Sequence, residues 1–191
     1  HAETVLFNGD PRALATGALG SEASCVAPQT KVIPRSLSAQ VWTFAASPTG
    51  PELAHHNVFF RDDPKPEFEA IAAGRPAPDP TLYICAQDRG TGASAPSIER
   101  FEIIANAAPL TGAKTPEEFS KCQSRTFRTL ANFGLTFDPM PQTKALTTPQ
   151  DFDTLFPATA GSLYGQSPHG TTAAFQRPTA RTPLKGLYLA G

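Results

Sequence analysis

Apolar and polar residues alternate along much of the chain with the period of two that is typical of β-strands with one buried face. The clearest example is LSAQVWTFAAS, residues 37–47. Three more strands are predicted at 55–60 (HHNVFF), 81–87 (TLYICAQ) and 99–108 (ERFEIIANAA). Several strands in succession with few helices between them favour a largely antiparallel sheet.

Helical spacing of apolar residues appears in three other stretches. KPEFEAIAAG, residues 65–74, follows a capping DDP and ends in glycine, and TPQDFDTLF, residues 148–156, opens with a similar start signal. The strongest prediction covers 115–134, where Thr115 and Glu118 form a capping box. Its apolar stripe consists of Phe119, Cys122, Thr126, Leu130 and Phe133. These elements predict an α+β fold: a mixed, largely antiparallel sheet with helices on one face.

Two apolar runs lie near the ends of the chain. TVLFN, residues 4–8, is predicted to be a strand, and Asp10 is expected to cap a helix over 11–20. KGLYLAG, residues 185–191, predicts a last strand that is buried on both faces, because its apolar residues are continuous.

Composition narrows the class of protein. The chain has 191 residues, is 40% hydrophobic and 17% charged, and carries a net charge of −1. This length can bury a core, and the weak net charge provides no long-range attraction for nucleic acid. The 20 prolines indicate stiff connections, including one at 48–51. Three cysteines without a CxxC pair predict no disulfide framework, and Cys85 is expected to pack as a small hydrophobic residue.

Two motifs suggest chemistry that their surroundings do not favour. GTGASA, residues 90–95, has the glycine spacing of a dinucleotide fingerprint, but Pro96 follows it and no helix can open there. We expect a hairpin loop instead. His55 and His56 suggest a metal site, but adjacent side chains of a strand point to opposite faces, so no metal site is predicted.

Hydrolytic chemistry is not favoured either. The serines lack a GxSxG elbow, and His169 lies in the loop sequence SPHGTT, where a histidine is usually solvated. Aromatic residues are more suggestive: most are expected in the core, and some can line a long apolar slot. Those residues are Phe59, Phe60, Tyr83, Phe101, Phe156, Tyr164, Phe175 and Tyr188.

Several stretches together resemble one family: FNGDPRAL, HHNVFFRDD, DPTLYICAQDR, ERFEIIANAAP, FPATAGSLYGQSPHG and AFQRPTARTPLKGLYLAG. Their succession is similar to the carotenoid desaturases, which are FAD-dependent, amine-oxidase-like flavoproteins. Within that family the wording YICAQDR and SLYGQSPHG favours the branch of 1-hydroxycarotenoid 3,4-desaturases, or methoxyneurosporene dehydrogenases.

The resemblance implies a two-domain FAD oxidoreductase and an interior piece of it. Residues 1–20 match an edge of the Rossmann-like FAD-binding domain, 21–170 an incomplete substrate-binding domain, and 171–191 the return into the FAD-binding domain. Gly191 matches the first glycine of a flavin-contacting segment, and the N-terminal GxGxxG unit that holds the ADP half of FAD has no counterpart in the sequence.

The resemblance also implies site residues and partners, but no catalytic residue. Cofactor-binding positions are Asn8, Gly9, Asp10, Leu189, Ala190 and Gly191, and substrate-binding positions are Phe60, Tyr164, Gly165 and His169. The expected cofactor is FAD, which takes the hydride while the protein aligns the substrate. A carotenoid substrate implies a cytoplasmic protein in peripheral contact with the cytoplasmic or photosynthetic membrane. No segment has the roughly 18 apolar residues of a membrane span.

The expected reaction introduces a C=C bond at C3–C4 of a 1-hydroxylated acyclic carotene, in biosynthesis of spheroidene or spirilloxanthin type. The first alternative is a phytoene desaturase or a related carotenoid oxidoreductase on the same scaffold. The second is a non-enzymatic module that binds an apolar ligand. The piece alone is expected to be inactive, because the segment that binds the ADP half of FAD is outside it.

Overall fold

The computed structural model describes residues 2–90, 92, 94–110 and 117–190. These residues form two compact units. The sheet unit is the continuous stretch Ser38–Pro149, and the terminal unit combines 1–37 with 150–191. By its contacts the terminal unit includes 21–37 and 150–170, which the resemblance assigns to the substrate-binding domain, and that assignment stays a prediction. Which cofactor or substrate each unit binds stays a prediction.

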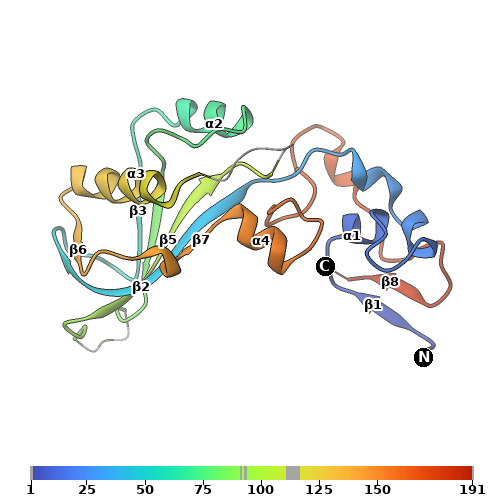
Figure 1. The fold of residues 1–191 in the computed structure, drawn as a ribbon, viewed down its shortest axis with the longest axis horizontal. Coiled ribbons are helices and arrows are strands. Elements are labelled where there is room, and N and C mark those ends of the chain that lie inside the picture. The colour runs from blue at the N-terminus through green and yellow to red at the C-terminus, as the bar shows by residue number, and fades with distance from the viewer. Residues whose placement is uncertain (1, 91, 93, 111–116, 191) are drawn as a thin grey trace. The chain divides into compact units, whose positions relative to one another are not determined.

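The sheet unit is built on six antiparallel strands (Figure 1). They are β2 (Ser38–Thr49), β3 (His56–Phe59), β4 (Leu82–Ala86), β5 (Glu99–Ala107), β6 (Thr136–Asp138) and β7 (Leu146–Thr147). The spatial order is β3-β4-β5-β2-β6, and β7 pairs with β2. All pairs within this sheet are antiparallel, so the α+β class and the four main strands are confirmed.

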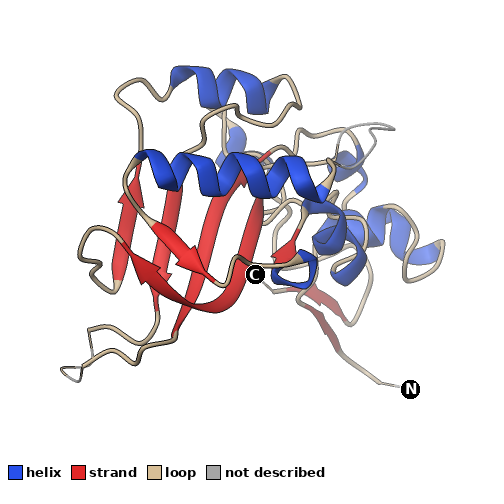
Figure 2. Ribbon diagram, turned by 60° about the vertical axis from the view of Figure 1, so that its left-hand side comes forward, coloured by secondary structure: helices blue, strands red, loops and turns tan. Residues whose placement is uncertain are grey.

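One face of this sheet carries the core. Helix α3 (Phe119–Asn132) crosses it, as Figure 2 shows, and contributes Cys122, Phe127 and Leu130 to a cluster with Trp42 and Ile103. The Trp42 and Phe127 rings meet edge to face, with centroids 5.1 Å apart. The alternation of β2 and β5 places Trp42 opposite Ile103, so both point toward the helix. The predicted helical stripe therefore finds its partner in the predicted strands.

The start of α3 differs from the capping-box expectation. Thr115 lies outside the described residues, and the helix begins only at Phe119, with Glu118 in an extended conformation before it. Glu117 also stays outside the helix, because its carboxylate accepts hydrogen bonds from Arg125 Nη2 at 2.7 Å and from Gln40 Nε2 at 3.1 Å. These long-range contacts override the local capping signal.

Helix α2 (Lys65–Ala72) follows the predicted helix closely, and Gly74 ends it with φ of +65°. Its Glu67 is 4% exposed. Glu67 Oε2 accepts hydrogen bonds from the Thr81 amide at 3.0 Å and the Thr81 hydroxyl at 2.7 Å, and Oε1 accepts one from Asn106 at 3.1 Å. This buried carboxylate thereby ties α2 to the residue before β4 and to the end of β5.

Proline 48 contradicts the expectation of a connection at 48–51, since it lies within β2. There β2 pairs with β6, Pro48 opposite Phe137, and its pairing with β5 has already ended at Ala46. A strand with one neighbour tolerates proline because the missing N–H can be on the unpaired side.

In the terminal unit, β1 (Val5–Phe7) and β8 (Leu187–Leu189) form a parallel two-stranded sheet. Helix α1 (Pro11–Ala15) follows β1 and is shorter than the predicted 11–20, because Gly17 and Gly20 adopt left-handed conformations with φ of +88° and +94°. Helix α4 (Pro149–Leu155) agrees with its prediction. Short 3-10 turns occupy Glu22–Cys25, Pro28–Lys31 and Ala173–Gln176 here, and Thr143–Ala145 in the sheet unit.

The last strand is not buried on both faces. Tyr188 is 39% exposed, and Leu187 and Leu189 are half-buried, because within the described part of the chain β1 is the one strand that pairs with β8. The expectation that most of the eight aromatics lie in the core is also wrong. Phe101 alone of the eight is buried and Phe59 packs against the core, whereas Phe175 is 89% exposed.

Among the described residues, no helix is long and apolar enough to cross a membrane.

Candidate functional site

The parallel pairing of β1 and β8 brings two sets of candidate cofactor residues to one edge. Phe7 pairs with Leu189, and the Ala190 amide donates to the Phe7 carbonyl at 3.0 Å. The strands run in the same direction, so Asn8, at the end of β1, and Ala190, at the end of β8, share the carboxyl edge. In open parallel sheets this edge is where ligands bind. Gly191 lies outside the described residues.

Asp10 occupies the turn that leads from this edge into α1. Its Oδ1 accepts a hydrogen bond from the Arg12 amide at 2.9 Å, so the predicted cap is confirmed. Its Oδ2 forms an ion pair with Arg35, and both side chains are less than a tenth exposed. An aspartate held on both oxygens has a fixed orientation.

Arg35 connects Asp10 to the residues just before the GSLYG segment, 161–165. Its Nε donates to the Thr159 carbonyl at 3.1 Å, while Arg12 Nη1 donates to the Ala158 carbonyl at 2.7 Å. Gly165 lies beside the ion pair: a Cβ built there would be 3.5 Å from Asp10 Oδ2. The structure therefore brings together a candidate cofactor residue and a candidate substrate residue. Sequence reasoning missed Arg35, which no local motif marks.

Hydrogen bonds shape the GSLYG turn and leave the Tyr164 side chain free of the core. The Ser36 hydroxyl accepts from the Tyr164 amide at 3.0 Å and is 2.6 Å from the Ser162 hydroxyl, and the Ser36 amide donates to the Gly165 carbonyl at 2.9 Å. Tyr164 is 72% exposed. It projects from a hydrogen-bonded turn and is accessible to a ligand.

The other two substrate candidates are both exposed. His169 is exposed in its loop, as the sequence predicted. Phe60 follows β3 in the sheet unit and is 64% exposed. Of the four substrate candidates, Tyr164 and Gly165 are therefore neighbours in one turn, and the roles of all four stay predictions.

An open groove of about 620 Å³ lies in the terminal unit. Val26, Ile33 and Phe175 line it together with Arg177 and Arg181. No aspartate or glutamate is among the described residues that line it. The groove thus combines apolar surface with positive charge. No sequence motif predicted it, because its residues come from two stretches that are far apart in the chain.

The sheet face opposite α3 carries a row of apolar side chains that sequence reasoning also missed. Val58 pairs with Tyr83, Tyr83 with Ile104, and Ile104 with Val41, so these side chains lie next to one another on one face. We call these four residues the apolar row. Tyr83, Ile104 and Val41 are half-buried, and Val58 is 54% exposed. Four adjacent strands at about 4.8 Å spacing give the row a length of roughly 14 Å.

Tyr83, between Val58 and Ile104, gives the row a polar group that stays uncharged. Its pKa is raised, first because burial disfavours the phenolate and second because of the neighbouring Cys85. The apolar row therefore offers an apolar strip with one neutral hydroxyl, which is 2.7 Å from His56 Nδ1, and such a strip suits a long hydrophobic ligand with few polar groups.

No protein-family model matches the chain. Curated relatives do. The chain is 55% identical over 190 residues to the hydroxyneurosporene desaturase of Cereibacter sphaeroides, a match that covers 100% of the chain and 38% of the relative. It is 54% identical over 186 residues to the enzyme of that name from Rhodobacter capsulatus, covering 97% of the chain and 37% of the relative. The chain belongs to the carotenoid desaturase family.

Membership of the family confirms the resemblance that the sequence stretches carried. A more distant relative is the 4,4'-diapolycopene oxygenase of Methylomonas, which is 31% identical over 147 residues, covering 74% of the chain and 30% of that protein. The chain spans less than two fifths of the length of the curated desaturases it matches, at 38% and 37%. What the whole protein does is therefore a matter for proposal.

Proposed function

We propose that the whole protein is an FAD-dependent carotenoid 3,4-desaturase that acts on 1-hydroxylated acyclic carotenes, in biosynthesis of spheroidene or spirilloxanthin type. The observation that carries this proposal is the 55% identity to a hydroxyneurosporene desaturase along the whole chain. Desaturation removes one hydrogen from each of two neighbouring carbons, and the two electrons leave with them.

FAD is the proposed acceptor, and its chemistry when bound is to take up the hydride. The chain's own residues fit a supporting role at the carboxyl edge of β1 and β8. Gly9 and Ala190 at this edge carry little or no side chain, and Asp10 is fixed by Arg35. We assign Asn8, Gly9, Asp10, Leu189, Ala190 and Gly191 to the surface that faces the cofactor.

The apolar row is our proposed support for the polyene. Burying a polyene against half-buried Ile104 and Val41 removes apolar surface from water on both sides, worth about 25 cal/mol per Å². The chain supplies alignment and excludes water, and no acid or base is required of the row. Phe60, Tyr164, Gly165 and His169 stay proposed substrate contacts from the resemblance. A lipid-dissolved substrate also favours peripheral contact of a cytoplasmic protein with the membrane.

The test compares two variants of the full-length protein in cells that accumulate its 1-hydroxylated substrate. Ile104→Asn places an amide in the apolar row, where burying it unpaired costs roughly 1–3 kcal/mol. Conversion of the carotene should fall by about tenfold, since 1.36 kcal/mol corresponds to a factor of ten. Extracted pigments are separated and quantified, and protein amount and bound flavin are measured alongside.

Thr43→Asn is the matched control, because Thr43 is exposed on the same sheet face but pairs with Glu102, outside the row. Its conversion should equal that of the unaltered protein. Equal conversion by both variants, at equal protein and flavin content, would exclude the apolar row as the substrate support.

The match to a carotenoid oxygenase keeps a second candidate function in view. The same pigment extracts distinguish the two reactions. A desaturase product is lighter than its substrate by two hydrogens, whereas an oxygenase product has gained oxygen. An oxygenated product from the full-length protein would overturn the desaturase proposal and leave the family membership intact.

A further inference from the structure

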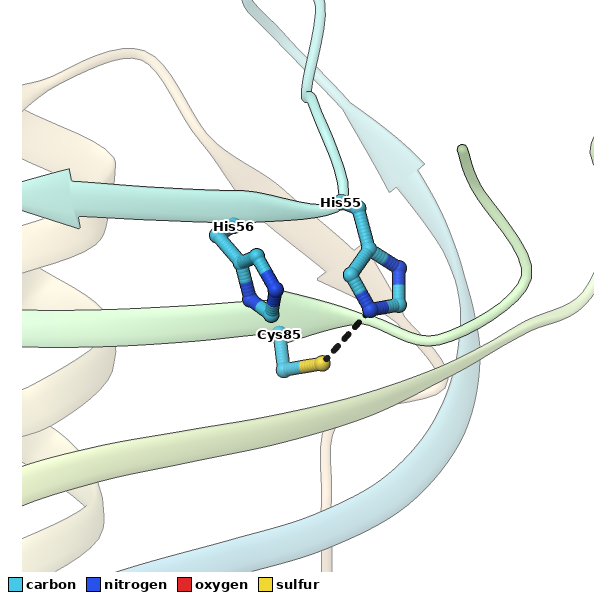
Figure 3. Close-up of side chains that lie close together, drawn as sticks. All are labelled: His55, His56 and Cys85. Carbon is cyan, nitrogen blue, oxygen red and sulfur yellow. Dashed lines mark hydrogen bonds between the residues drawn. The ribbon is translucent and has the colours of Figure 1, made fainter. Parts of the chain in front are cut away.

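Three potential metal ligands lie together beside the edge strand of the sheet. A ring nitrogen of His55, a ring nitrogen of His56 and Cys85 Sγ are all within 4.8 Å of one another (Figure 3). The two imidazole rings meet edge to face, with centroids 4.3 Å apart. His56 and Cys85 are register partners of β3 and β4, which explains why their side chains share a face.

This arrangement contradicts the reason for which no metal site was predicted. The argument from alternation assumed that both histidines belong to a strand, but β3 begins at His56 and His55 precedes it. Outside the strand the His55 side chain does not follow the period of two, and its ring turns toward that of His56.

His55 is held in the orientation that a metal ligand needs. Its Nδ1 is 3.0 Å from the Ala86 carbonyl oxygen and 2.8 Å from that of Arg89. Carbonyl groups only accept, so Nδ1 carries the proton and Nε2 keeps its lone pair. Gly90 packs against the other side: a Cβ there would be 3.1 Å from His55 Cβ. A backbone carbonyl that binds the second ring nitrogen is the usual partner of a metal-ligating histidine.

The lone pair of His55 Nε2 faces Cys85 Sγ at 3.7 Å. Zinc bonds of about 2.0–2.1 Å to nitrogen and 2.3 Å to sulfur, at a tetrahedral angle, separate the two ligand atoms by about 3.5 Å. The observed distance is therefore close to that required by a shared zinc ion. The His56 ring is restrained by the Tyr83 hydroxyl, 2.7 Å from its Nδ1.

We propose that His55, His56 and Cys85 form a Zn²⁺ site that fastens the edge strand β3 to β4 and to the turn after it. Two imidazoles and one thiolate are a ligand set that zinc prefers, and the exposed position of His56 leaves the fourth coordination position to water. Binding converts the Cys85 thiol to a thiolate, and the proton is released to solvent. The site is independent of the desaturase proposal and needs no flavin.

The experiment titrates the metal-free, tag-free chain with Co²⁺, whose absorption reports its ligands. One equivalent should produce a thiolate-to-cobalt charge-transfer band in the near ultraviolet and the strong visible bands of a tetrahedral ion. One equivalent of Zn²⁺ should then remove both. Absence of the thiolate band in the unaltered chain overturns the proposal.

Variants identify the ligands. Cys85→Ser should abolish the charge-transfer band, and His56→Ala should weaken zinc binding by about 100-fold or more, since even loss of an outer partner costs 10–100-fold. His56 is exposed, so its variant is expected to keep the fold, which circular dichroism checks. The matched controls are Cys25→Ser and His169→Ala, which remove an exposed thiol and an exposed imidazole elsewhere. A band that survives in Cys85→Ser, or that disappears in Cys25→Ser, contradicts the assignment.

Discussion

Asp10 and Arg35 form an ion pair whose side chains are only 7% and 8% exposed to solvent. The pair joins the turn after β1 to the segment before β2. Removing one partner leaves a buried charge uncompensated, which typically costs 3–5 kcal/mol. We expect Asp10→Ala to lower the free energy of unfolding by about that amount, part of it from the lost helix cap. Urea titration measures the change.

The control for this pair is the exposed pair of Lys65 and Glu69, whose side chains are 76% and 65% exposed. Glu69→Ala should change the unfolding free energy by less than about 1 kcal/mol, because solvent screens such pairs. A similar loss in both variants would show that burial does not set the strength of the Asp10–Arg35 pair.

Substituting Glu67 is expected to lower stability for a different reason, the loss of a buried hydrogen-bond acceptor. Its carboxylate satisfies the backbone amide and hydroxyl of Thr81. Glu67→Ala leaves these donors without a partner, at a cost of about 1–3 kcal/mol. Glu67→Gln keeps one acceptor oxygen and should lose less. Thermal melting of the two variants gives the comparison, and a larger loss in Glu67→Gln than in Glu67→Ala would contradict this role.

Gly50 is expected to tolerate no side chain. A Cβ there would lie 2.2 Å from the Gly134 carbonyl oxygen, and φ is +141°. Gly50→Ala should therefore destabilise the sheet unit by more than the roughly 1–2 kcal/mol of backbone strain alone. Gly134→Ala separates the two effects, because Gly134 also has positive φ, at +81°, but has open space around its Cβ position. If urea titrations gave Gly50→Ala and Gly134→Ala the same loss of unfolding free energy, the steric contact at Gly50 would be ruled out.

Cys122 should be almost inert toward thiol reagents. Burial raises its pKa from 9.0 to about 12, and Sγ donates to Gln40 Oε1 at 3.0 Å. At pH 8 about one thiol in ten thousand is then ionised, and the thiolate is the reacting form. A colorimetric thiol titration of the folded chain should detect Cys25, which is exposed, and miss Cys122 until denaturant is added. Rapid labelling of Cys122 in the folded Cys25→Ser variant would refute this.

The same shift has a defined pH dependence. The folded-state pKa of Cys122 is above its unfolded value, so its contribution to stability is complete below pH 9 and is lost as pH rises toward 12. Cys122→Ser removes this titration. The difference in unfolding free energy between the two proteins should therefore narrow between pH 9 and the highest pH at which both fold, as urea titrations at each pH can measure.

Local signals predicted the elements well. The alternation around Trp42, the glycine after α2 and the cap of Asp10 each act within a few residues, and all appear in the structure. Contacts between residues far apart in the chain could not be predicted from the sequence. Arg35 contacts Asp10 and Thr159. Glu117 lies outside the predicted helix and binds Arg125, because partners that the fold brings near outweigh local helix propensity.

For the candidate site too, the sequence pointed to single residues, and the structure showed which of them are neighbours. The resemblance supplied Asp10 and Gly165, and the structure added that they are neighbours. The apolar row was hidden, because its members come from four strands whose register no local pattern fixes. The strand was predicted to begin at His55, but β3 begins at His56. Because His55 lies outside the strand, its side chain does not point away from that of His56 as the alternation had predicted.

The sheet unit is one unbroken stretch, Ser38–Pro149, and the cluster around Trp42 lies wholly inside it. Two crossovers in the gene, one at each boundary, would thus transfer all the described strands of this sheet from one relative to another without separating Asp10 from Arg35. The sheet unit could in this way be exchanged between relatives, while the hydrogen bonds at the ends of β1 and β8 are inherited unchanged.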